Sequence, residues 1–323
     1  MKRINKNRLN MKKVTIWKGL LIACMLGIAP SAEAQQNVTS ILEVLDTQTG
    51  LRTTVKEFNY LIEAPNWSRD GRWIYFNSGG LIYRINTDGK SNAGLVDTQY
   101  VCKCNNDHVL SFDGQWLAVS SSSNATSGWS SYIYVLPAEG GTPRLVTPYG
   151  PSYLHGWSPD GQTLAYCAFR DVAPGADIYT ISVNGGEEMR LTDAPGLDDG
   201  PEYSPDGKHI WFNSVRTGLM QVWRMNTDGS EQTQMTFDIT RNAWFPHVSP
   251  DGKQVIYITY HKGDLKPDQH LANKNVELWL MSAEGGEPRL AAKLFGGQGT
   301  INTNSWAPDS RHVAFVSYRL SND

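Results

Sequence analysis

The sequence predicts an all-β protein, a six-bladed β-propeller with four antiparallel strands in each blade. A short phrase, Trp-Ser-Pro-Asp-Gly or a variant of it, occurs six times. The aspartates of successive copies are 43, 47, 46, 45 and 58 residues apart. An alternating apolar stretch, typical of a strand, follows each copy. Self-similarity at this spacing is typical of propellers and solenoids.

The first element of each repeat is a hairpin built on this phrase, and its intact copy occupies residues 157–161. Proline fixes φ at the first turn position, aspartate can bond the backbone two residues further on, and glycine accepts positive φ. A strand therefore enters the turn and a second strand leaves it. The other copies occupy residues 67–71, 111–114, 203–207, 248–252 and 306–310.

A second hairpin follows the first in each repeat. In one repeat its strands are residues 133–136 and 144–147, joined by a turn at 138–141 that contains two glycines. Two hairpins give four strands per repeat, which is one propeller blade.

The two ends of the chain are predicted to share one blade. Residues 40–55 form a second-type hairpin with no first-type hairpin before it, and residues 302–318 form a first-type hairpin with no partner after it. Joining them closes the ring and removes free sheet edges, which would otherwise invite aggregation.

The repeated phrase resembles that of the TolB-like six-bladed propellers over roughly residues 40–320. The six copies make the resemblance specific for the fold. One fold hosts many activities, so the resemblance implies much less about function.

The N-terminus, residues 1–34, has the layout of a secretory signal peptide. Basic residues precede an apolar run at 19–29, and a small-residue site at 32–34 follows it. We therefore expect export to the periplasm or beyond the cell. The mature chain, residues 35–323, would form a single propeller domain.

A second interpretation of the leader is open, because Leu21-Ile22-Ala23-Cys24 fits a lipoprotein cleavage box. In that case Cys24 would carry a lipid anchor. No other stretch approaches the roughly 20 apolar residues of a membrane-spanning helix.

Charge makes nucleic acid an unfavourable partner. Removing residues 1–34 leaves 22 Lys and Arg against 31 Asp and Glu, a formal charge of −9, whereas phosphate backbones require a basic surface. No glycine-rich loop leads from a strand into a helix, so we expect no nucleotide cofactor. A closed propeller has no need to oligomerise, and we expect a monomer.

A candidate site lies where the innermost strands begin, because these segments meet at one mouth of the central channel. Imidazoles from several strands together with an amide suit a divalent metal such as Mn, Zn, Fe or Ca. Asp107 and Asp199 are the candidate catalytic acid–base groups beside that metal. The candidate metal ligands are His108, His155, His247 and Gln298.

Side chains on the same face are suited to an acidic sugar. Aromatic rings stack on the apolar face of a sugar, and arginine binds a carboxylate with two parallel bonds. A long connection with His261 and His270 adds further basic groups to this face. The candidate substrate-binding residues are Arg170, Arg216, Trp244, Asn106 and Asn302.

The candidate set is similar to that of oligogalacturonate lyases, propellers that hold a divalent metal with three histidines and a glutamine. The spacing of the histidines does not match that family's motif, so the resemblance assigns no roles to individual residues.

Two functions follow as hypotheses. The first is an exported metal-dependent lyase or hydrolase that acts on an acidic carbohydrate or other small ligand at the channel mouth. The second is a non-catalytic propeller that binds a glycan, a peptide or an envelope protein. In the second case the polar side chains simply bond exposed backbone around the channel.

Overall fold

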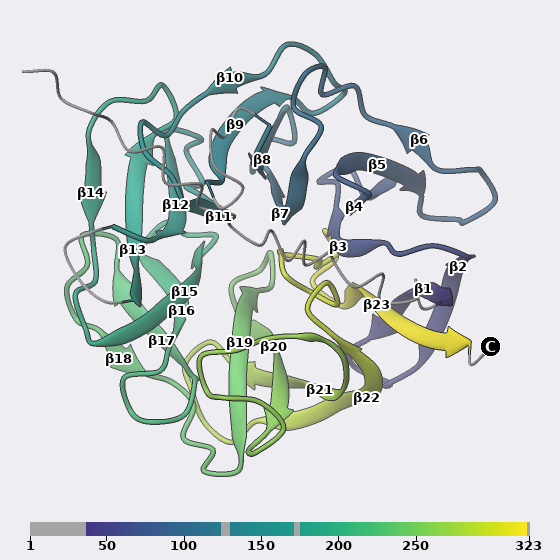
Figure 1. Cartoon of the computed structure of the whole chain (residues 1–323). Coiled ribbons are helices and arrows are strands. Elements are labelled where there is room, and N and C mark those ends of the chain that lie inside the picture. Colours follow the sequence, from purple (N-terminus) through teal and green to yellow (C-terminus); the bar gives the residue numbers. More distant parts are fainter. Residues whose placement is uncertain (1–36, 124–129, 171–174, 322–323) are drawn as a thin grey trace, which may run out of the picture. The chain divides into compact units, whose positions relative to one another are not determined.

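The computed structural model of the protein describes residues 37–123, 130–170 and 175–321. Within these residues the regular elements are all β-strands, arranged around a ring (Figure 1). None of this part of the chain forms a helix long and apolar enough to cross a membrane. The predicted leader, including Cys24, lies outside the described residues.

The strands form five hydrogen-bonded sheets, three of which have four strands. The first contains β3 (Glu63–Trp67), β4 (Trp73–Ser78), β5 (Leu81–Asn86) and β6 (Gly94–Leu95). The second contains β7 (Cys104–Leu110), β8 (Trp116–Ser121), β9 (Tyr132–Pro137) and β10 (Arg144–Leu145). The third contains β19 (Arg241–Val248), β20 (Gln254–His261), β21 (Ala272–Ser282) and β22 (Arg289–Gly297).

The two other sheets have eight strands and three strands. The eight-stranded sheet contains β11 (Ser152–Trp157), β12 (Thr163–Ala168), β13 (Gly175–Ser182), β14 (Glu188–Arg190), β15 (Gly196–Tyr203), β16 (His209–Ser214), β17 (Gln221–Asn226) and β18 (Thr233–Gln234). The three-stranded sheet contains β1 (Asn37–Asp46), β2 (Arg52–Phe58) and β23 (His312–Ser321).

The propeller architecture is confirmed, but the expectation of six separate four-stranded blades is wrong as stated. β13 pairs in parallel with β15 through Gly175 and Gly196, and this joins two successive meanders into one sheet. A Cβ at Gly175, where φ is +114°, would lie 2.0 Å from the Gly196 carbonyl oxygen, so the junction requires glycine. In the three-stranded sheet of β1, β2 and β23, the 301–306 segment contributes a single β-bridge, Trp306 to Val313, in place of a fourth strand.

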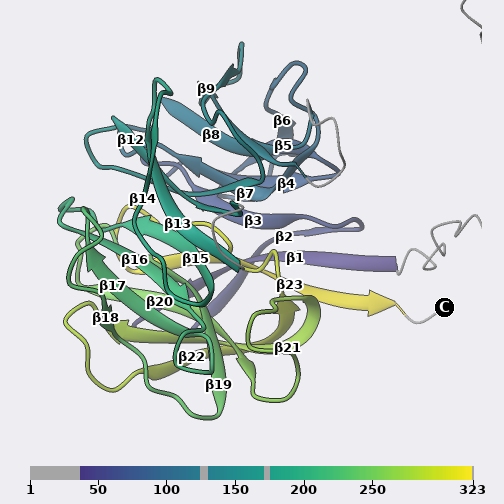
Figure 2. The same ribbon diagram turned by 60° about the vertical axis from the view of Figure 1, so that its left-hand side comes forward.

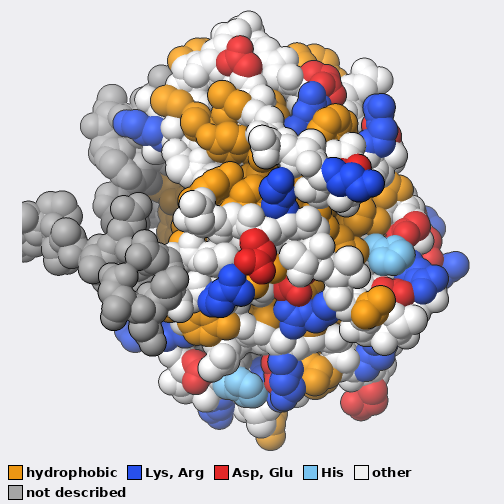
Figure 3. Space-filling model, turned by 90° about the vertical axis from the view of Figure 1, so that its right-hand side faces the viewer, with side chains coloured by type: hydrophobic (Ala, Val, Ile, Leu, Met, Phe, Trp, Pro, Cys, Tyr) orange, Lys and Arg blue, Asp and Glu red, His pale blue; other side chains and the backbone are white. Residues whose placement is uncertain are grey.

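The predicted pairing of the two ends of the chain is confirmed. β1 pairs antiparallel with β23 over ten residues, from Asn37 opposite Ser321 to Asp46 opposite His312. The two strands run side by side in both ribbon views (Figures 1 and 2). An ion pair between Arg311 and Asp46 reinforces this seam, at 2.5 Å. On the side that carries these strands in Figure 1, hydrophobic side chains gather among scattered charged ones (Figure 3).

The recurring phrase forms the turn that its sequence predicts. In the intact copy the Ser158 hydroxyl donates to Asp160 Oδ1 at 2.5 Å and accepts the Thr163 N–H at 2.9 Å. Gly161 has φ of +70°. The four copies at 68–71, 111–114, 204–207 and 249–252 make the same two serine bonds, and their glycines lie between +70° and +76°.

The sixth copy keeps the turn without these residues. Ala307 stands where the other copies have serine, and Ser310 adopts φ of +56° where they have glycine. Asp309 Oδ1 still accepts the N–H groups of Arg311 and His312. The turn at the seam of the ring is therefore the least regular of the six.

All five innermost strands, β3, β7, β11, β15 and β19, carry a register shift where they approach the ring centre. In β7, for example, three residues (105–107) stand opposite Ser120 alone. Such β-bulges redirect side chains and end the simple inward–outward alternation. The bulges therefore decide which polar side chains point at one another in the centre.

Candidate functional site

The innermost strands converge at the centre of the ring (Figure 1), and a cluster of their ionisable side chains lies there. It draws residues from β3, β7, β11, β15 and the connection between β20 and β21. We call it the ring-centre cluster, and it consists of Glu63, Asp107, His155, Asp199 and His270.

His155 is the hub of the ring-centre cluster. Its Nε2 lies 3.2 Å from Asp199 Oδ1 and 3.9 Å from Asp107 Oδ1. The residue is 5% exposed, and it stacks on Phe245 with ring centroids 5.6 Å apart. Burial alone would lower the pKa of the imidazole, but the two carboxylates outweigh that effect and raise the pKa to about 9. His155 is thus a buried imidazolium between two acids.

Asp199 links both histidines of the cluster. Its second oxygen, Oδ2, lies 3.9 Å from Nε2 of His270. Burial alone would raise the pKa of Asp199. The hydrogen bond and the positive charge of His155 outweigh the effect of burial, so the pKa lies below its usual value and the carboxyl group is ionised. His270 packs against Trp244 at 4.6 Å, and burial lowers the pKa of its imidazole. This connection therefore packs onto the ring centre through aromatic contacts, with His270 near Asp199.

The two other carboxyl groups of the cluster are harder to ionise. Burial raises the pKa of Asp107 to about 6, against the charge of His155. Burial together with the charge of Asp107 raises the pKa of Glu63 to about 7, against a hydrogen bond from Asn106. With three acids and one charged histidine, the cluster is close to neutral only while Glu63 and Asp107 keep their protons.

The four predicted metal ligands do not share one site. His108 is fully buried, and its imidazole faces the backbone of Tyr75 and Ala64 in the neighbouring sheet. Burial lowers the pKa of its imidazole to about 4, although its interactions with those backbone groups act to raise it. His108 and His155 lie equally far in sequence from the aspartates of the turn phrases that follow them. The register shift is larger in β7 than in β11, however, and it turns Asp107, not His108, toward His155.

His247 has both ring nitrogens engaged elsewhere. Nδ1 lies 2.7 Å from Glu202 Oε2, and Nε2 lies 2.5 Å from the Ile301 carbonyl oxygen. Glu202 also accepts hydrogen bonds from the Val248 N–H and the Asn304 amide. These contacts tie β15 and β19 to the 301–306 segment, and they leave no nitrogen of His247 for a metal.

Gln298 lies in the turn after β22, where its N–H bonds the Leu271 carbonyl oxygen at 3.2 Å. No group of three or more His, Cys, Asp or Glu side chains in the described residues is arranged to hold a metal ion. The donors first expected to form a metal centre therefore do not fit one, because partners within the protein already occupy or redirect them.

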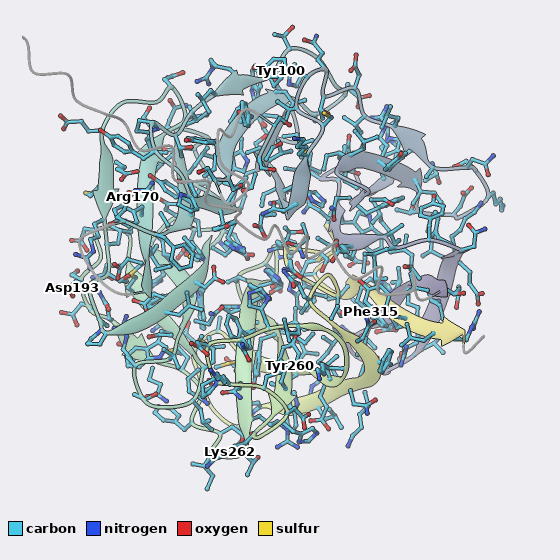
Figure 4. The ribbon with its side chains drawn as sticks, viewed as in Figure 1. Tyr100, Arg170, Asp193, Tyr260, Lys262 and Phe315 are labelled. Carbon is cyan, nitrogen blue, oxygen red and sulfur yellow. The ribbon has the colours of Figure 1, made fainter. Side chains whose placement is uncertain are left out.

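The two predicted substrate-binding arginines are also engaged within the protein. Arg170 makes paired bonds to Glu188 at 2.7 and 2.8 Å and further bonds to Pro151 and Ser152. It lies away from the centre of the ring (Figure 4). Arg216 bonds Asp198, Ser214 and Gln232 at 2.5 to 2.7 Å. Neither guanidinium is placed to receive a sugar carboxylate at the ring centre.

The remaining predicted substrate-binding residues are buried. Trp244 has no exposed surface and packs in the core with His270. Asn106 is 6% exposed, and Asn302 is 1% exposed and accepts the Gly299 N–H. They support the backbone and the ring-centre cluster rather than presenting an open sugar site.

The sequence prediction omitted Glu63 and placed His270 only among the basic groups of a long connection. Glu63 lies seven residues before Asp70, as Asp199 lies seven before Asp206, so the window that found Asp199 would also have found Glu63 in the first repeat. His270 carries no such signal, because a long connection brings it to the centre. Cys167, which lies near Asp199, has its thiol pKa raised well above the usual range by burial, so it is no thiolate nucleophile.

Comparisons with known proteins agree with the architecture. The family described as TolB beta propeller domain matches residues 155–292. An uncharacterised protein of Agrobacterium fabrum is 43% identical over 282 residues, which cover 87% of this chain and 93% of that protein. The Tol-Pal system protein TolB of Bordetella pertussis is 35% identical over 143 residues, 31% of this chain. That match spans 33% of the TolB protein's length.

Solved structures with a similar fold include TolB proteins and an oligogalacturonate lyase. A putative TolB from Agrobacterium tumefaciens, 43% identical, has a TM-score of 0.82 and covers 88% of this chain and 99% of its own. TolB from Acinetobacter baumannii has 18% identity, a TM-score of 0.60 and coverages of 82% and 66%. An oligogalacturonate lyase from Vibrio parahaemolyticus has 13% identity, a TM-score of 0.50 and coverages of 80% and 74%. At such low identity the last two share the fold alone.

Proposed function

The chain belongs to the TolB-like β-propeller family, and we propose that it works as a non-catalytic binding propeller of the bacterial cell envelope. The observation that carries this proposal is that the charged groups a catalytic centre would need are bound to one another. His155 is held between two carboxylates, His247 has both nitrogens engaged, and Arg216 is saturated by internal acceptors.

The ring-centre cluster has a role that needs no substrate. It draws on four innermost strands, with charged pairs between β7, β11 and β15, and the β20–β21 connection packs onto it where the strands converge. A buried charge that loses its partner is costly, so such a cluster fixes the relative positions of the strands. Asp107 and Asp199, first considered as acid–base catalysts, would on this account be positioning groups of the scaffold.

The partner we propose is a protein of a Tol-Pal system. Support comes from the relatives, one of which is a Tol-Pal system protein TolB and another a putative TolB that resembles nearly the whole chain. The predicted signal peptide at residues 1–34 agrees with an envelope location, periplasmic or secreted. We propose that the propeller acts there as a monomer without a metal or nucleotide cofactor.

The test is calorimetric titration of residues 35–323, purified without chelator or tag, with the Pal protein encoded in the same genome. We expect saturable binding of one Pal protein per propeller. Elemental analysis of the same preparation should show no stoichiometric metal.

Absence of binding would overturn the proposed partner. One metal ion per chain, together with cleavage of acidic oligosaccharides, would overturn the non-catalytic role and restore the lyase or hydrolase hypothesis.

A further inference from the structure

The turn between β3 and β4 departs from the repeated phrase. Arg69 stands at the position where four of the five other copies have proline. In the second copy the same position is Phe112. The two departures meet, because the guanidinium carbon of Arg69 lies 4.5 Å from the ring centroid of Phe112. Two successive repeats have therefore replaced the proline with a stacked arginine and phenylalanine.

The turns of successive repeats adjoin one another, and we call the surface that they form the turn face. A Cβ added at Gly114 would lie 3.5 Å from the Cβ of Arg69, and one added at Gly71 would lie 3.8 Å from the Cγ of Pro308. Glu63 of the ring-centre cluster is the first residue of β3, whereas Arg69 follows the last residue of β3 by two positions. Arg69 therefore lies at the other end of this strand from the cluster.

The guanidinium of Arg69 is unpaired. Its Nε is buried without a hydrogen-bond partner, and its terminal nitrogens, Nη1 and Nη2, have none among the described residues but are not buried. Every other described arginine donates a hydrogen bond or forms an ion pair except Arg144, which is exposed. A half-buried charge without a partner is costly to the fold.

The carboxylate of Glu202 acts on Arg69 through its charge but does not bond it. Its Oε2 lies 2.7 Å from His247 Nδ1, and its Oε1 accepts the Val248 N–H at 2.8 Å and the Asn304 amide at 2.7 Å. The charge of Glu202 acts to raise the pKa of Arg69, but burial outweighs it and lowers that pKa. The charge of the guanidinium is therefore incompletely compensated within the protein.

The carboxylates of the two adjoining turns are engaged as well. Asp70 pairs with Arg72 at 2.6 Å, and Asp113 accepts the Ser111 hydroxyl at 2.5 Å. Both aspartates also accept a backbone N–H of their own turns. These bonds hold the turns in shape, so neither carboxylate is available to Arg69.

A second arginine on an aromatic ring shows which group such a guanidinium takes. Arg84 of β5 lies 4.7 Å from the ring centroid of Trp73, and it pairs with Glu139 of the next repeat. Arg69 has the aromatic part of this arrangement, in Phe112. Among the described residues no carboxylate supplies the other part.

We propose that Arg69 binds a carboxylate of a partner polypeptide on the turn face, through Nη1 and Nη2, while Phe112 holds the plane of the guanidinium. Two terminal nitrogens of one guanidinium match the two oxygens of one carboxylate. An acidic side chain and a chain terminus both present this group, and the test separates them. The proposal deepens the proposed function, since it rests on the chain being a binding propeller and names the chemistry that it recognises.

The test uses two carboxylate probes and a neutral control at constant ionic strength. N-acetyl-L-glutamic acid α-amide carries the side-chain carboxylate, N-acetyl-L-glutamine carries the terminal one, and N-acetyl-L-glutamine amide carries neither. The readout is the Nε–H signal of Arg69 in a ¹H–¹⁵N NMR spectrum, assigned by its loss in Arg69→Lys. We expect a saturable shift at roughly millimolar concentration with a carboxylate probe, and at least about fivefold weaker binding of the neutral amide. The tighter of the two carboxylate probes identifies the source.

Three variants and one control locate the site, with the backbone N–H of Gly114 as the reporter. Arg69→Pro places the proline of the other copies in the turn, and Arg69→Gln keeps a polar side chain there. Both should abolish the saturable shift, and Arg69→Lys, which keeps the charge without the fork, should weaken binding about threefold or more. Arg144→Gln removes the exposed arginine of β10 and should leave binding unchanged.

Three results would overturn the proposal. They are equal binding of the neutral amide, undiminished binding of the carboxylate probes to Arg69→Gln, and no saturable shift up to about a hundredfold excess of probe.

The outcome is separable from that of the proposed function. If a carboxylate probe binds at Arg69 but the Pal protein does not bind, the carboxylate site stands and the proposed partner is wrong. If the Pal protein binds Arg69→Gln as tightly as the unchanged protein, the propeller docks its partner through another surface and the role of Arg69 in docking is refuted.

Discussion

The ring centre and the outer rim near Phe237 differ in how far their side chains are exposed. At the centre, His155 finds its counter-charges in Asp199 and Asp107, side chains of neighbouring strands. At the rim, Arg241 lies over Trp279 at 5.0 Å and pairs with Glu277 and Asp238, while Phe237 nearby is 73% exposed. The difference teaches that polar residues gathered at the ring centre pair with one another within the scaffold, whereas exposed apolar side chains such as Phe237 mark a surface open to a partner.

The largest effect is expected at the ring centre. Asp199→Asn removes the carboxylate that binds His155 and faces His270, and it leaves a buried imidazolium with Asp107 alone. We expect the free energy of unfolding, measured in urea, to fall by about 3 kcal/mol. Glu287→Gln, the matched loss of an acid at the rim, should change it by less than about 0.5 kcal/mol. Equal losses for the two variants would erase the contrast between the two regions.

A smaller effect is expected on the pH dependence of stability. The pKa of Glu63 is raised to about 7 and that of His155 to about 9. Both groups hold protons more tightly in the folded protein. Their stabilisation is therefore complete below the unfolded pKa values and is lost as pH rises through the folded ones.

Wild-type stability should therefore fall between pH 5 and pH 9. In Glu63→Gln the fall between about pH 5 and 7 should be smaller by about 2 kcal/mol, while the contribution of Asp107, whose pKa is raised to about 6, and the fall toward pH 9 remain. Urea unfolding at five pH values would show this, and parallel curves for the two proteins would contradict the raised pKa of Glu63.

Stability at the rim should respond little to the loss of an exposed apolar side chain. Phe237 is 73% exposed, so Phe237→Ser should shift the free energy of unfolding by less than about 0.5 kcal/mol. A loss of stability above about 2 kcal/mol would mean that Phe237 is a packing residue and not part of a contact surface.

The smallest effect is expected at a departure from the repeat that has no binding role. Ser310 has φ of +56° where the five other turns have glycine. Ser310→Gly relieves that strain but loses the bond from the Asp251 N–H to the serine hydroxyl, so we expect a net gain of about 0.5 kcal/mol. Thermal unfolding would measure it. A loss of stability would show that the hydroxyl bond outweighs the strain.

The repeated phrase predicted more of this molecule than any other feature. Ser158, Asp160 and Gly161 make a turn whose bonds are local, so sequence alone was sufficient to infer it. The pairing of β1 with β23 followed from counting hairpins. The parallel pairing of β13 with β15 could not be predicted in this way, because it depends on only two residue pairs, which begin at Gly175 and Gly196.

The candidate site was predicted in part. Asp107, His155 and Asp199 do come together, but His108 and His247 do not join them. The reason is the register shift in each innermost strand, which turns neighbouring side chains to different sides without a periodic signal in the sequence. Arg170 and Arg216 do not join them either, because Glu188 and Asp198, which lie in other strands, bind their guanidinium groups.

The most direct test of the account is the protonation state of His155, read from the ring nitrogens in a long-range ¹H–¹⁵N NMR spectrum at pH 7.5. His155→Gln would assign the signals. The account predicts an imidazolium that titrates near pH 9 and does not shift when Zn²⁺ or Mn²⁺ is added. A neutral imidazole whose signals shift or broaden with stoichiometric metal would contradict it, and would make the ring centre a metal site rather than a charge-paired part of the scaffold.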